Sequence, residues 1–227
     1  MAVYAIGDLH LPFGRNLSME VFGPVWKDYT QRLAQNWGRL VSESDTVVVA
    51  GDLSWAGDMN EAVADFLWLE KLPGKKLLVK GNHDHYWCSV SRMRRILAEN
   101  GVASVDFIHN SSVYADGLSL CGTRGWFLDE TGDRKVFERE LGRLTRSLEA
   151  ARDRDSRICF LHYPPVCREF DCCEIRKILE DFGVKHCYYG HLHGNSVSGA
   201  FRGTINGVKY DCISADSVGF MPVLIRE

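Results

Sequence analysis

The feature that most constrains this chain is a series of short polar blocks, each placed directly after a short apolar run. Such runs are typical of buried β-strands, and open α/β sheets hold their ligands at the carboxyl ends of strands. A fold built from this pattern therefore gathers several strand ends around one site. In chain order the blocks are Asp8-Leu9-His10, Gly51-Asp52, Gly81-Asn82-His83-Asp84, His162, and Gly190-His191-Leu192-His193.

The residue types in these blocks are those that bind divalent transition metals. Asp8 and His10 stand two positions apart at a predicted strand end, so their side chains point the same way and can share one metal. Asp52 has two carboxylate oxygens with which to bridge two ions, and Asn82 offers a neutral amide oxygen. Imidazoles suit Zn, Fe, Mn or Ni. The candidate metal ligands are Asp8, His10, Asp52, Asn82, His162, His191 and His193.

Each of these residues also has an ordinary structural explanation, because a single histidine or a Gly-Asp turn is usually structural. The joint pattern reverses that judgement, since five of the eight histidines fall in the blocks. Gly51 removes a side chain where we expect metal and phosphate to approach closely. Two carboxylates facing two divalent ions leave a positive cavity, which suits an anionic phosphate ester.

Strand and helix signals alternate along most of the chain, which predicts an α/β fold. The whole of residues 1–227 is expected to form a single domain in which two sheets face each other with helices outside. In the first half, the predicted strands are Val3–Ile6, Thr46–Ala50 and Lys76–Lys80, and the predicted helices are Pro24–Val41, Asn60–Leu69 and Val90–Ala98.

The second half begins with a predicted hairpin in which Val105–Tyr114 pairs with Leu118–Cys121 around Asp116-Gly117. A long amphipathic helix follows between Val136 and Ala151. Beyond Ser196 the pattern is β only, with a hairpin turn at Asn206-Gly207. Strands at Arg157–Leu161 and His186–Tyr189 flank a helix near Glu174–Phe182.

The five blocks, read as D-x-H, G-D, G-N-H-[DE], H and G-H-x-H, resemble the signature of the calcineurin-like metallophosphoesterase family from Asp8 to His193. This resemblance implies the family's four-layer α/β/β/α sandwich of two facing mixed sheets. It also implies that His83, free of metal, acts as a general acid that the adjacent Asp84 orients and charges. The implied metal sites are Asp8, His10, Asp52 and His193 for one ion, and Asp52, Asn82, His162 and His191 for the other.

The resemblance further implies a phosphohydrolase that uses two divalent transition metal ions, with Mn, Fe, Zn and Ni as candidates. A hydroxide bridging the two ions would attack the phosphorus of a phosphodiester or phosphomonoester in line, while His83 protonates the leaving group. The alternatives are a nuclease acting on DNA or RNA, a non-catalytic scaffold of the same fold, and a regulatory protein whose metals are structural. The presence of His83 argues against a scaffold, which needs no general acid.

The blocks say little about the group attached to phosphorus. Arg124 and Arg15 are candidate substrate contacts, because a guanidinium can bind phosphate bidentately. Protein serine/threonine phosphatases of this superfamily carry an arginine two places before the asparagine, where this chain has Lys80, so we do not expect their activity. A group of basic residues could form a nucleic-acid site, but a solvated helix face and strand end is the better explanation. These residues are Lys75, Lys76, Lys80, Arg92, Arg94 and Arg95.

Composition sets further bounds. The net charge of -3 gives no overall reason to expect nucleic acid or an anionic membrane as partner. No apolar run approaches the roughly 18 residues of a membrane span, and the first candidate ligand comes too early for a signal peptide. We expect a cytoplasmic protein with reduced cysteines and a small phosphate-ester substrate. We do not expect a cysteine-based zinc site, because the cysteines lack the paired C-x-x-C spacing of such sites. The cysteines considered are Cys167, Cys172, Cys173 and Cys187.

Overall fold

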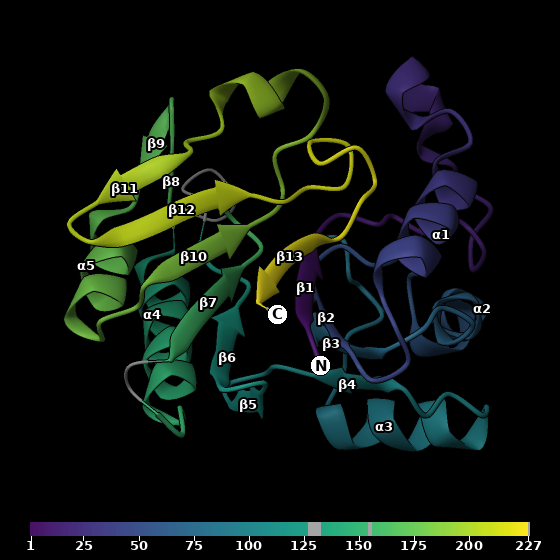
Figure 1. Cartoon of the computed structure of the whole chain (residues 1–227), viewed down its shortest axis with the longest axis horizontal. Coiled ribbons are helices and arrows are strands. Elements are labelled where there is room, and N and C mark those ends of the chain that lie inside the picture. Colours follow the sequence, from purple (N-terminus) through teal and green to yellow (C-terminus); the bar gives the residue numbers. More distant parts are fainter. Residues whose placement is uncertain (127–132, 154–155, 227) are drawn as a thin grey trace.

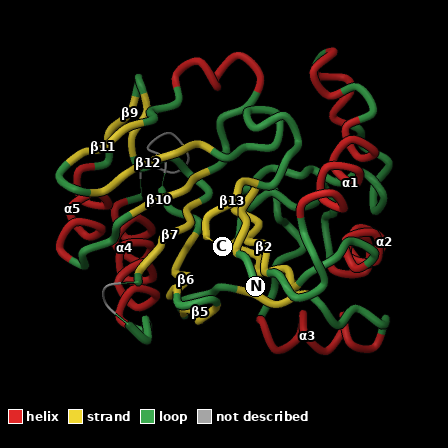
Figure 2. Tube along the Cα trace, in the orientation of Figure 1, coloured by secondary structure: helices red, strands yellow, loops and turns green. Residues whose placement is uncertain are grey.

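Two β-sheets lie face to face, with helices on their outer sides (Figure 1). The computed structural model describes residues 1–126, 133–153 and 156–226. The first sheet has the strand order β13-β1-β2-β3-β4, and the second has the order β11-β12-β10-β7-β6-β5. Helices α1, α2 and α3 lie beside the first sheet, and α4 and α5 beside the second (Figure 2). The predicted four-layer α/β/β/α sandwich is confirmed.

The first sheet contains β1 (Val3–Ile6), β2 (Thr46–Ala50), β3 (Lys75–Val79), β4 (Val105–Phe107) and β13 (Val223–Arg226). The second contains β5 (Ser112–Ala115), β6 (Leu118–Thr123), β7 (Arg157–Leu161), β10 (His186–Tyr189), β11 (Gly203–Ile205) and β12 (Val208–Cys212). The helices are α1 (Tyr29–Leu40), α2 (Met59–Glu70), α3 (Val90–Glu99), α4 (Arg134–Glu149) and α5 (Cys173–Asp181). Shorter elements are η1 (Met19–Phe22), η2 (Pro24–Trp26), η3 (Gly194–Gly199), β8 (Val166–Cys167) and β9 (Phe170–Asp171).

Alternating side chains along the strands build three apolar layers. In β2, Val47 and Val49 face the helices of the first sheet, whereas Val48 and Ala50 face the second sheet. Phe160 of β7 packs into this same layer between the sheets. A third layer separates the second sheet from α4 and α5. Because the central strands are buried on both faces, their sequences are continuous apolar runs.

The parallel pairing of the central strands places the polar blocks at one edge. Strands β1, β2 and β3 run parallel in the first sheet, and β7 and β10 run parallel in the second. Each candidate block follows the carboxyl end of one of these strands. The two sheets also touch directly there, because Gly7 and Ser214 form an isolated parallel bridge.

Three sequence-based predictions of local structure were wrong. The stretch Val105–Tyr114 is not one hairpin strand, because β4 pairs with β3 in the first sheet while β5 pairs with β6 in the second. The predicted helix Pro24–Val41 is interrupted at Asp28, whose φ of 51° lies in the left-handed region. Beyond Ser196 the chain is not purely β, since η3 covers Gly194–Gly199.

The two predicted hairpin turns are confirmed. Asp116-Gly117 and Asn206-Gly207 both have positive φ at the two central positions, as type I′ hairpin turns require. All eight cysteines carry free thiols. Among the helices of the described ranges, none is long and apolar enough to cross a membrane.

Lys76 does not belong to a surface patch. Its side chain is fully buried, and its ammonium group donates hydrogen bonds to the Leu72 carbonyl and to Ser104 Oγ. Burial lowers the pKa of Lys76 to about 8, partly offset by the nearby Glu70 carboxylate. The folded structure therefore disfavours the protonated form of the Lys76 side chain.

We expect Lys76→Met to remove a pH dependence of stability. The unfolded chain, with a lysine pKa of about 10.4, binds more protons than the folded chain above about pH 8, so the free energy of unfolding rises with pH there. Between pH 7 and 9.5 the wild type should gain about 2 kcal/mol relative to Lys76→Met. Urea titrations across this range measure the gain, with the exposed Lys75→Met as control. Parallel stability profiles for wild type and Lys76→Met would contradict the prediction.

Candidate metal centre

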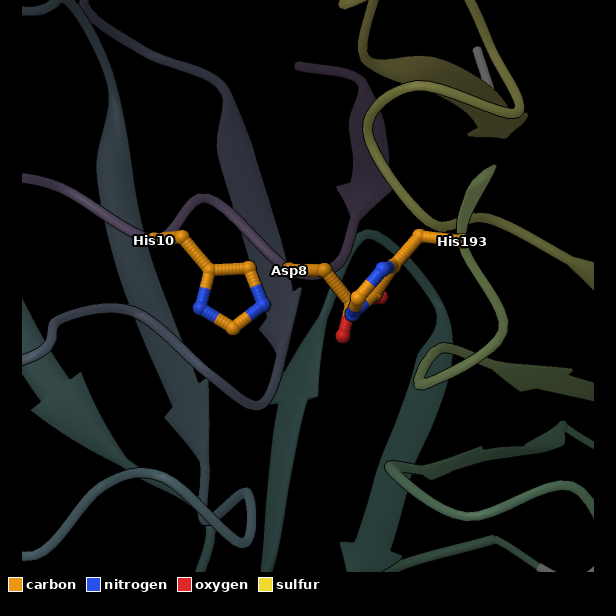
Figure 3. A group of neighbouring side chains, drawn as sticks. All are labelled: Asp8, His10 and His193. Atoms are coloured by element: carbon orange, nitrogen blue, oxygen red, sulfur yellow. The ribbon is translucent and has the colours of Figure 1, made fainter. Parts of the chain in front are cut away.

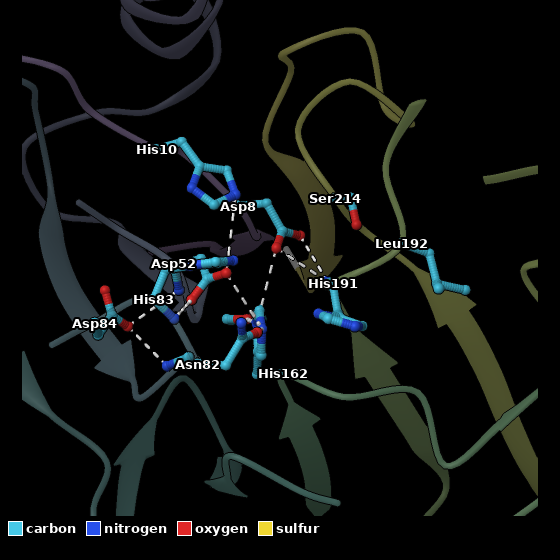
Figure 4. Close-up of polar contacts among 12 residues, drawn as sticks. Asp8, His10, Asp52, Asn82, His83, Asp84, His162, His191, Leu192 and Ser214 are labelled. Atoms are coloured by element: carbon cyan, nitrogen blue, oxygen red, sulfur yellow. Dashed lines mark hydrogen bonds and ion pairs between the residues drawn. The ribbon is translucent and has the colours of Figure 1, made fainter. Parts of the chain in front are cut away.

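Loops from both sheets bring the seven candidate ligands to one place (Figure 4; His193 in Figure 3). Asp8 and His10 follow β1, Asp52 follows β2, and Asn82 follows β3. The second sheet contributes His162 after β7, together with His191 and His193 after β10. The sequence blocks, far apart along the chain, thus form a single cluster at the shared edge of the sheets.

Asp8, His10 and His193 form one group whose ligand atoms lie within 4.8 Å of one another (Figure 3). The ring centroids of His10 and His193 are 5.3 Å apart. His10 Nε2 lies 3.8 Å from Asp52 Oδ2, which connects this group to the rest of the cluster. These distances suit side chains arranged around a divalent cation.

Asp8, Asp52 and His162 form a second group within the same 4.8 Å limit. His162 Nδ1 lies 3.2 Å from the Ala50 carbonyl oxygen, so Nδ1 donates there and Nε2 keeps its lone pair. Nε2 is 2.6 Å from Asn82 Oδ1 and 3.4 Å from Asp52 Oδ2. Lone pairs that face one another in this way repel unless a cation lies near them.

Asp8 belongs to both groups, although the sequence patterns suggested Asp52 as the bridging residue. The Asp8 carboxylate accepts the backbone N–H of His191 at 3.0 and 2.9 Å from its two oxygens. The His191 ring lies 5.2 Å from the His162 ring and edge-on to Tyr163. Asp8 therefore connects ligands that come from both sheets.

The glycines of the blocks are required because ligands from other blocks approach their backbone. A Cβ on Gly51 would lie 2.5 Å from His162 Nδ1, and one on Gly190 would lie 2.6 Å from Asp8 Oδ2. A Cβ on Gly81 would overlap Asp52 Oδ1. The sequence argument placed metal and phosphate against Gly51, whereas the structure places the His162 ring there.

Four of the candidate ligands have backbone in the left-handed region, with φ of 56° at Asp8, 45° at His10, 51° at Asp52 and 70° at His191. Non-glycine residues rarely adopt this conformation, which costs of order 1–3 kcal/mol each. The left-handed backbone conformation turns each chain segment away from the direction of the strand that it follows. Such strain is concentrated at functional sites, where the surrounding structure maintains it.

Burial sets the protonation of the cluster. It lowers the pKa of His10 and of His162 well below the ordinary value and lowers that of His191 to about 4, so these imidazoles are neutral. Burial also raises the pKa of Asp8 to about 8. Neither ring nitrogen of His10 has a hydrogen-bond partner among the described residues. A divalent cation fits this set, because it would satisfy these nitrogens and favour the ionised carboxylate.

The side chains of His83 and Asp84 have different surroundings at this edge. The His83 backbone N–H donates to Asp52 Oδ1 at 2.8 Å, and its ring packs 4.7 Å from the Trp55 ring. Asp84 is buried and accepts backbone N–H groups of three residues, Asp52, Leu53 and Gly81. Burial raises the pKa of Asp84, whereas these hydrogen bonds lower it. Asp84 thus ties the loop after β2 to the loop after β3.

Sequence reasoning missed Ser214 and Asp216. Ser214 lies near Asp8 (Figure 4), and its side chain lowers the pKa of the Asp8 carboxyl group, which burial raises. Asp216 Oδ2 accepts the Gly194 N–H at 2.6 Å and lies near His193. Both residues follow β12, which pairs in parallel with β10. The sequence signal for these two residues was a polar Ser-Ala-Asp run directly after a predicted strand. The sequence predicts a hairpin of β11 and β12, and it does not reveal that β12 also pairs in parallel with β10.

The two candidate substrate arginines have different environments. Arg15 forms an ion pair with Glu61 at 3.2 Å, and both side chains are largely exposed. The Arg124 backbone carbonyl accepts the N–H groups of His162 and Tyr163 at 3.1 and 2.9 Å. Arg124 also lines a cavity with Lys80. Among the residues that the structure describes, the compact groups of potential metal ligands contain aspartate and histidine and no cysteine.

Residues 1–195 match the family model of the calcineurin-like phosphoesterases. The Gene 66 proteins of Mycobacterium phages L5 and D29 are 31% identical over 77 residues and 36% identical over 84 residues. These alignments cover 34% and 36% of this chain and 37% and 40% of the phage proteins, so the chain spans about two fifths of these relatives.

Solved structures show the same fold at low sequence identity. The phosphopantetheinyl hydrolase of Mycobacterium tuberculosis is 14% identical, with a TM-score of 0.56, covering 94% of this chain and 89% of that one. A protein of unknown function from Aquifex aeolicus is also 14% identical, with a TM-score of 0.54, covering 98% and 95%. The family match spans the residues that the structure gathers at the sheet edge, and this chain therefore belongs to the calcineurin-like phosphoesterase family of metal-dependent phosphoric ester hydrolases.

Proposed function

We propose that this protein holds two divalent transition metal ions and hydrolyses a phosphodiester or phosphomonoester. The observation that carries the proposal is the presence of two adjacent groups of ligand atoms, one of Asp8, His10 and His193 and one of Asp8, Asp52 and His162. Asp8, His10, Asp52 and His193 would hold one ion, and Asp52, Asn82, His162 and His191 the other. The imidazole-rich donor set favours Mn, Fe, Zn or Ni over Mg or Ca.

When bound, the ions would supply Lewis-acid chemistry that activates water and stabilises charge on the phosphoryl oxygens. The chain provides neutral imidazoles and few carboxylates, which keeps the centre positive toward an anionic substrate. His83 is the proposed general acid, held at the rim by its N–H to Asp52 and by packing against Trp55. Asp84 is proposed as a positioning residue that acts on His83 through the backbone of the loops after β2 and β3.

The structure weakens the case for a nuclease. In the expected basic patch, Lys76 is buried, Arg94 pairs with Asp106 at 2.7 Å, and Arg95 pairs with Glu99 at 3.9 Å. Three of the six basic residues are thus buried or paired, which leaves less positive charge there for a nucleic-acid backbone. Arg15, whose guanidinium pairs with Glu61, is likewise a weaker substrate contact than Arg124. We therefore propose a small phosphate ester as substrate.

Metal removal tests the proposed function. Protein purified without chelator should contain two transition metal ions per chain by elemental analysis. Treatment with chelator should abolish hydrolysis of a phosphomonoester and a phosphodiester chromogen, and Mn²⁺, Fe²⁺, Zn²⁺ or Ni²⁺ should restore it. Tight metal binding without turnover of either ester by any of the four ions would instead indicate a scaffold or a structural metal site.

His83→Ala should retain both ions and lose most activity. A general acid typically contributes a factor of 10²–10⁴ to the rate, and an alkyl leaving group depends on it most. We therefore expect a loss of this size in kcat for an alkyl phosphodiester and a smaller loss for a nitrophenyl ester. His85→Ala, an exposed histidine two residues away, is the matched control. Cleavage of the alkyl diester at the parental rate would exclude His83 as the acid.

Gly81→Ala should weaken metal binding although it replaces none of the candidate ligands. The added Cβ would overlap the Asp52 carboxylate and displace it. Changes behind metal ligands typically cost 10- to 100-fold in affinity, and we expect a similar loss here. Metal titration measures the affinity, and Gly38→Ala, whose Cβ meets nothing within 4 Å, is the control. Equal affinity in both variants would show that Asp52 is not held against Gly81.

A further inference from the structure

The cavity that Arg124 and Lys80 line has a volume of about 180 Å³. Its lining includes Lys80, His109, Asn110, Arg124, Glu140 and Arg143. Lys80 follows β3, His109 and Asn110 follow β4, Arg124 follows β6, and the last two belong to α4. The cavity is therefore built at the same strand-end edge as the metal ligands, from residues of both sheets.

The charge of this cavity is positive. Lys80, Arg124 and Arg143 are three cations, and Glu140 is the one acid among the lining residues of the described chain. Glu140 is already engaged, because its carboxylate accepts the Gly125 N–H at 3.1 Å and pairs with Arg143 at 3.0 Å. Within the described ranges neither Lys80 nor Arg124 forms an ion pair. Among the described lining residues, Lys80 and Arg124 are thus left as cationic groups without an ion-pair partner, and the one carboxylate there is paired with Arg143.

Backbone connections hold this cavity next to the metal centre. Lys80 precedes the candidate ligand Asn82 by two residues, a span of about 7 Å in extended chain. Arg124 is fixed to the other side, since its carbonyl oxygen accepts the N–H groups of His162 and Tyr163. Short backbone connections therefore link two sides of the cavity to the candidate metal ligands Asn82 and His162.

Asn110 adds an unsatisfied hydrogen-bonding atom. Its Oδ1 is buried and has no hydrogen-bond partner in the described part of the chain. Buried polar atoms in native proteins are nearly always paired, and an unpaired one points to a missing partner. A hydroxyl group on a bound ligand would supply the donor that Asn110 lacks, while Lys80 and Arg124 bind an anion.

We propose that this cavity binds a second phosphate group of the substrate. The enzyme would then act on small phosphate esters that carry another phosphate a few bonds from the scissile one. Guanidinium and ammonium groups bind phosphate through charge-assisted hydrogen bonds, and Arg124 can do so bidentately. This inference rests on the proposed function, because the metal centre must cleave one ester while the cavity holds the other.

A matched pair of substrates tests the inference. The p-nitrophenyl ester of thymidine 5′-phosphate is compared with the same ester carrying a 3′-phosphate. One charge-assisted contact corresponds to roughly tenfold or more, so the 3′-phosphate should raise kcat/KM by at least that factor. Arg124→Met and Arg143→Met should each reduce this preference toward unity, whereas Arg139→Met, an exposed arginine on the same helix, should retain it.

Binding provides a readout that does not depend on turnover. Chelator-treated protein is titrated calorimetrically with thymidine 3′,5′-bisphosphate, and affinity should fall in Arg124→Met but not in Arg139→Met. Equal kcat/KM for both esters in the wild type would overturn the inference and leave the proposed function intact. Hydrolysis of neither ester would overturn the proposed function, and the calorimetric comparison would still decide the role of the cavity. A stronger preference for a single-stranded oligonucleotide would assign the cavity to nucleic acid instead.

Discussion

The backbone N–H of His191 donating to the Asp8 carboxylate is the interaction on which the rest of this site depends, because it joins the two sheets at their strand ends. It brings a fully buried carboxylate against the loop that carries two histidines. Gly190 permits this approach, since any side chain there would meet Asp8. Burial of Asp8 without a compensating cation is unfavourable, as its raised pKa shows. Metal binding would therefore stabilise the junction between the sheets as well as provide the reaction centre.

Much of the candidate site could be predicted from sequence because its ligands obey a simple local rule. Residues such as Asp52 and Asn82 follow buried strands that read as continuous apolar runs, and parallel strands end at one edge. The same rule failed for Ser214, since β12 follows β11 in a hairpin yet pairs in parallel with β10 on its other side. The division of Val105–Tyr114 between two sheets was also hidden, because pairing partners of short strands depend on tertiary contacts.

Close packing explains several residues whose roles the sequence patterns assigned to substrate or catalysis. Gly51 and Gly81 are glycines because ligand side chains fill the space of a Cβ. The Asp84 carboxylate, next to the proposed acid, is engaged by three backbone N–H groups. Sequence spacing reveals which residues gather at a strand end, but it does not reveal which atoms they contact. Contacts of this kind require the full arrangement of five loops.

The segment after residue 195, outside the family match, completes the structure that holds the candidate metal centre. Strand β12 extends the second sheet beside β10, and β13 pairs antiparallel with β1 in the first sheet. Between them, Ser214 forms a β-bridge with Gly7, and its side chain lowers the pKa of Asp8. The chain thus returns across both sheets at the edge where the ligands lie. A site assembled from loops of two sheets needs such a connection, because small movements of one sheet relative to the other would separate Asp8 from His191.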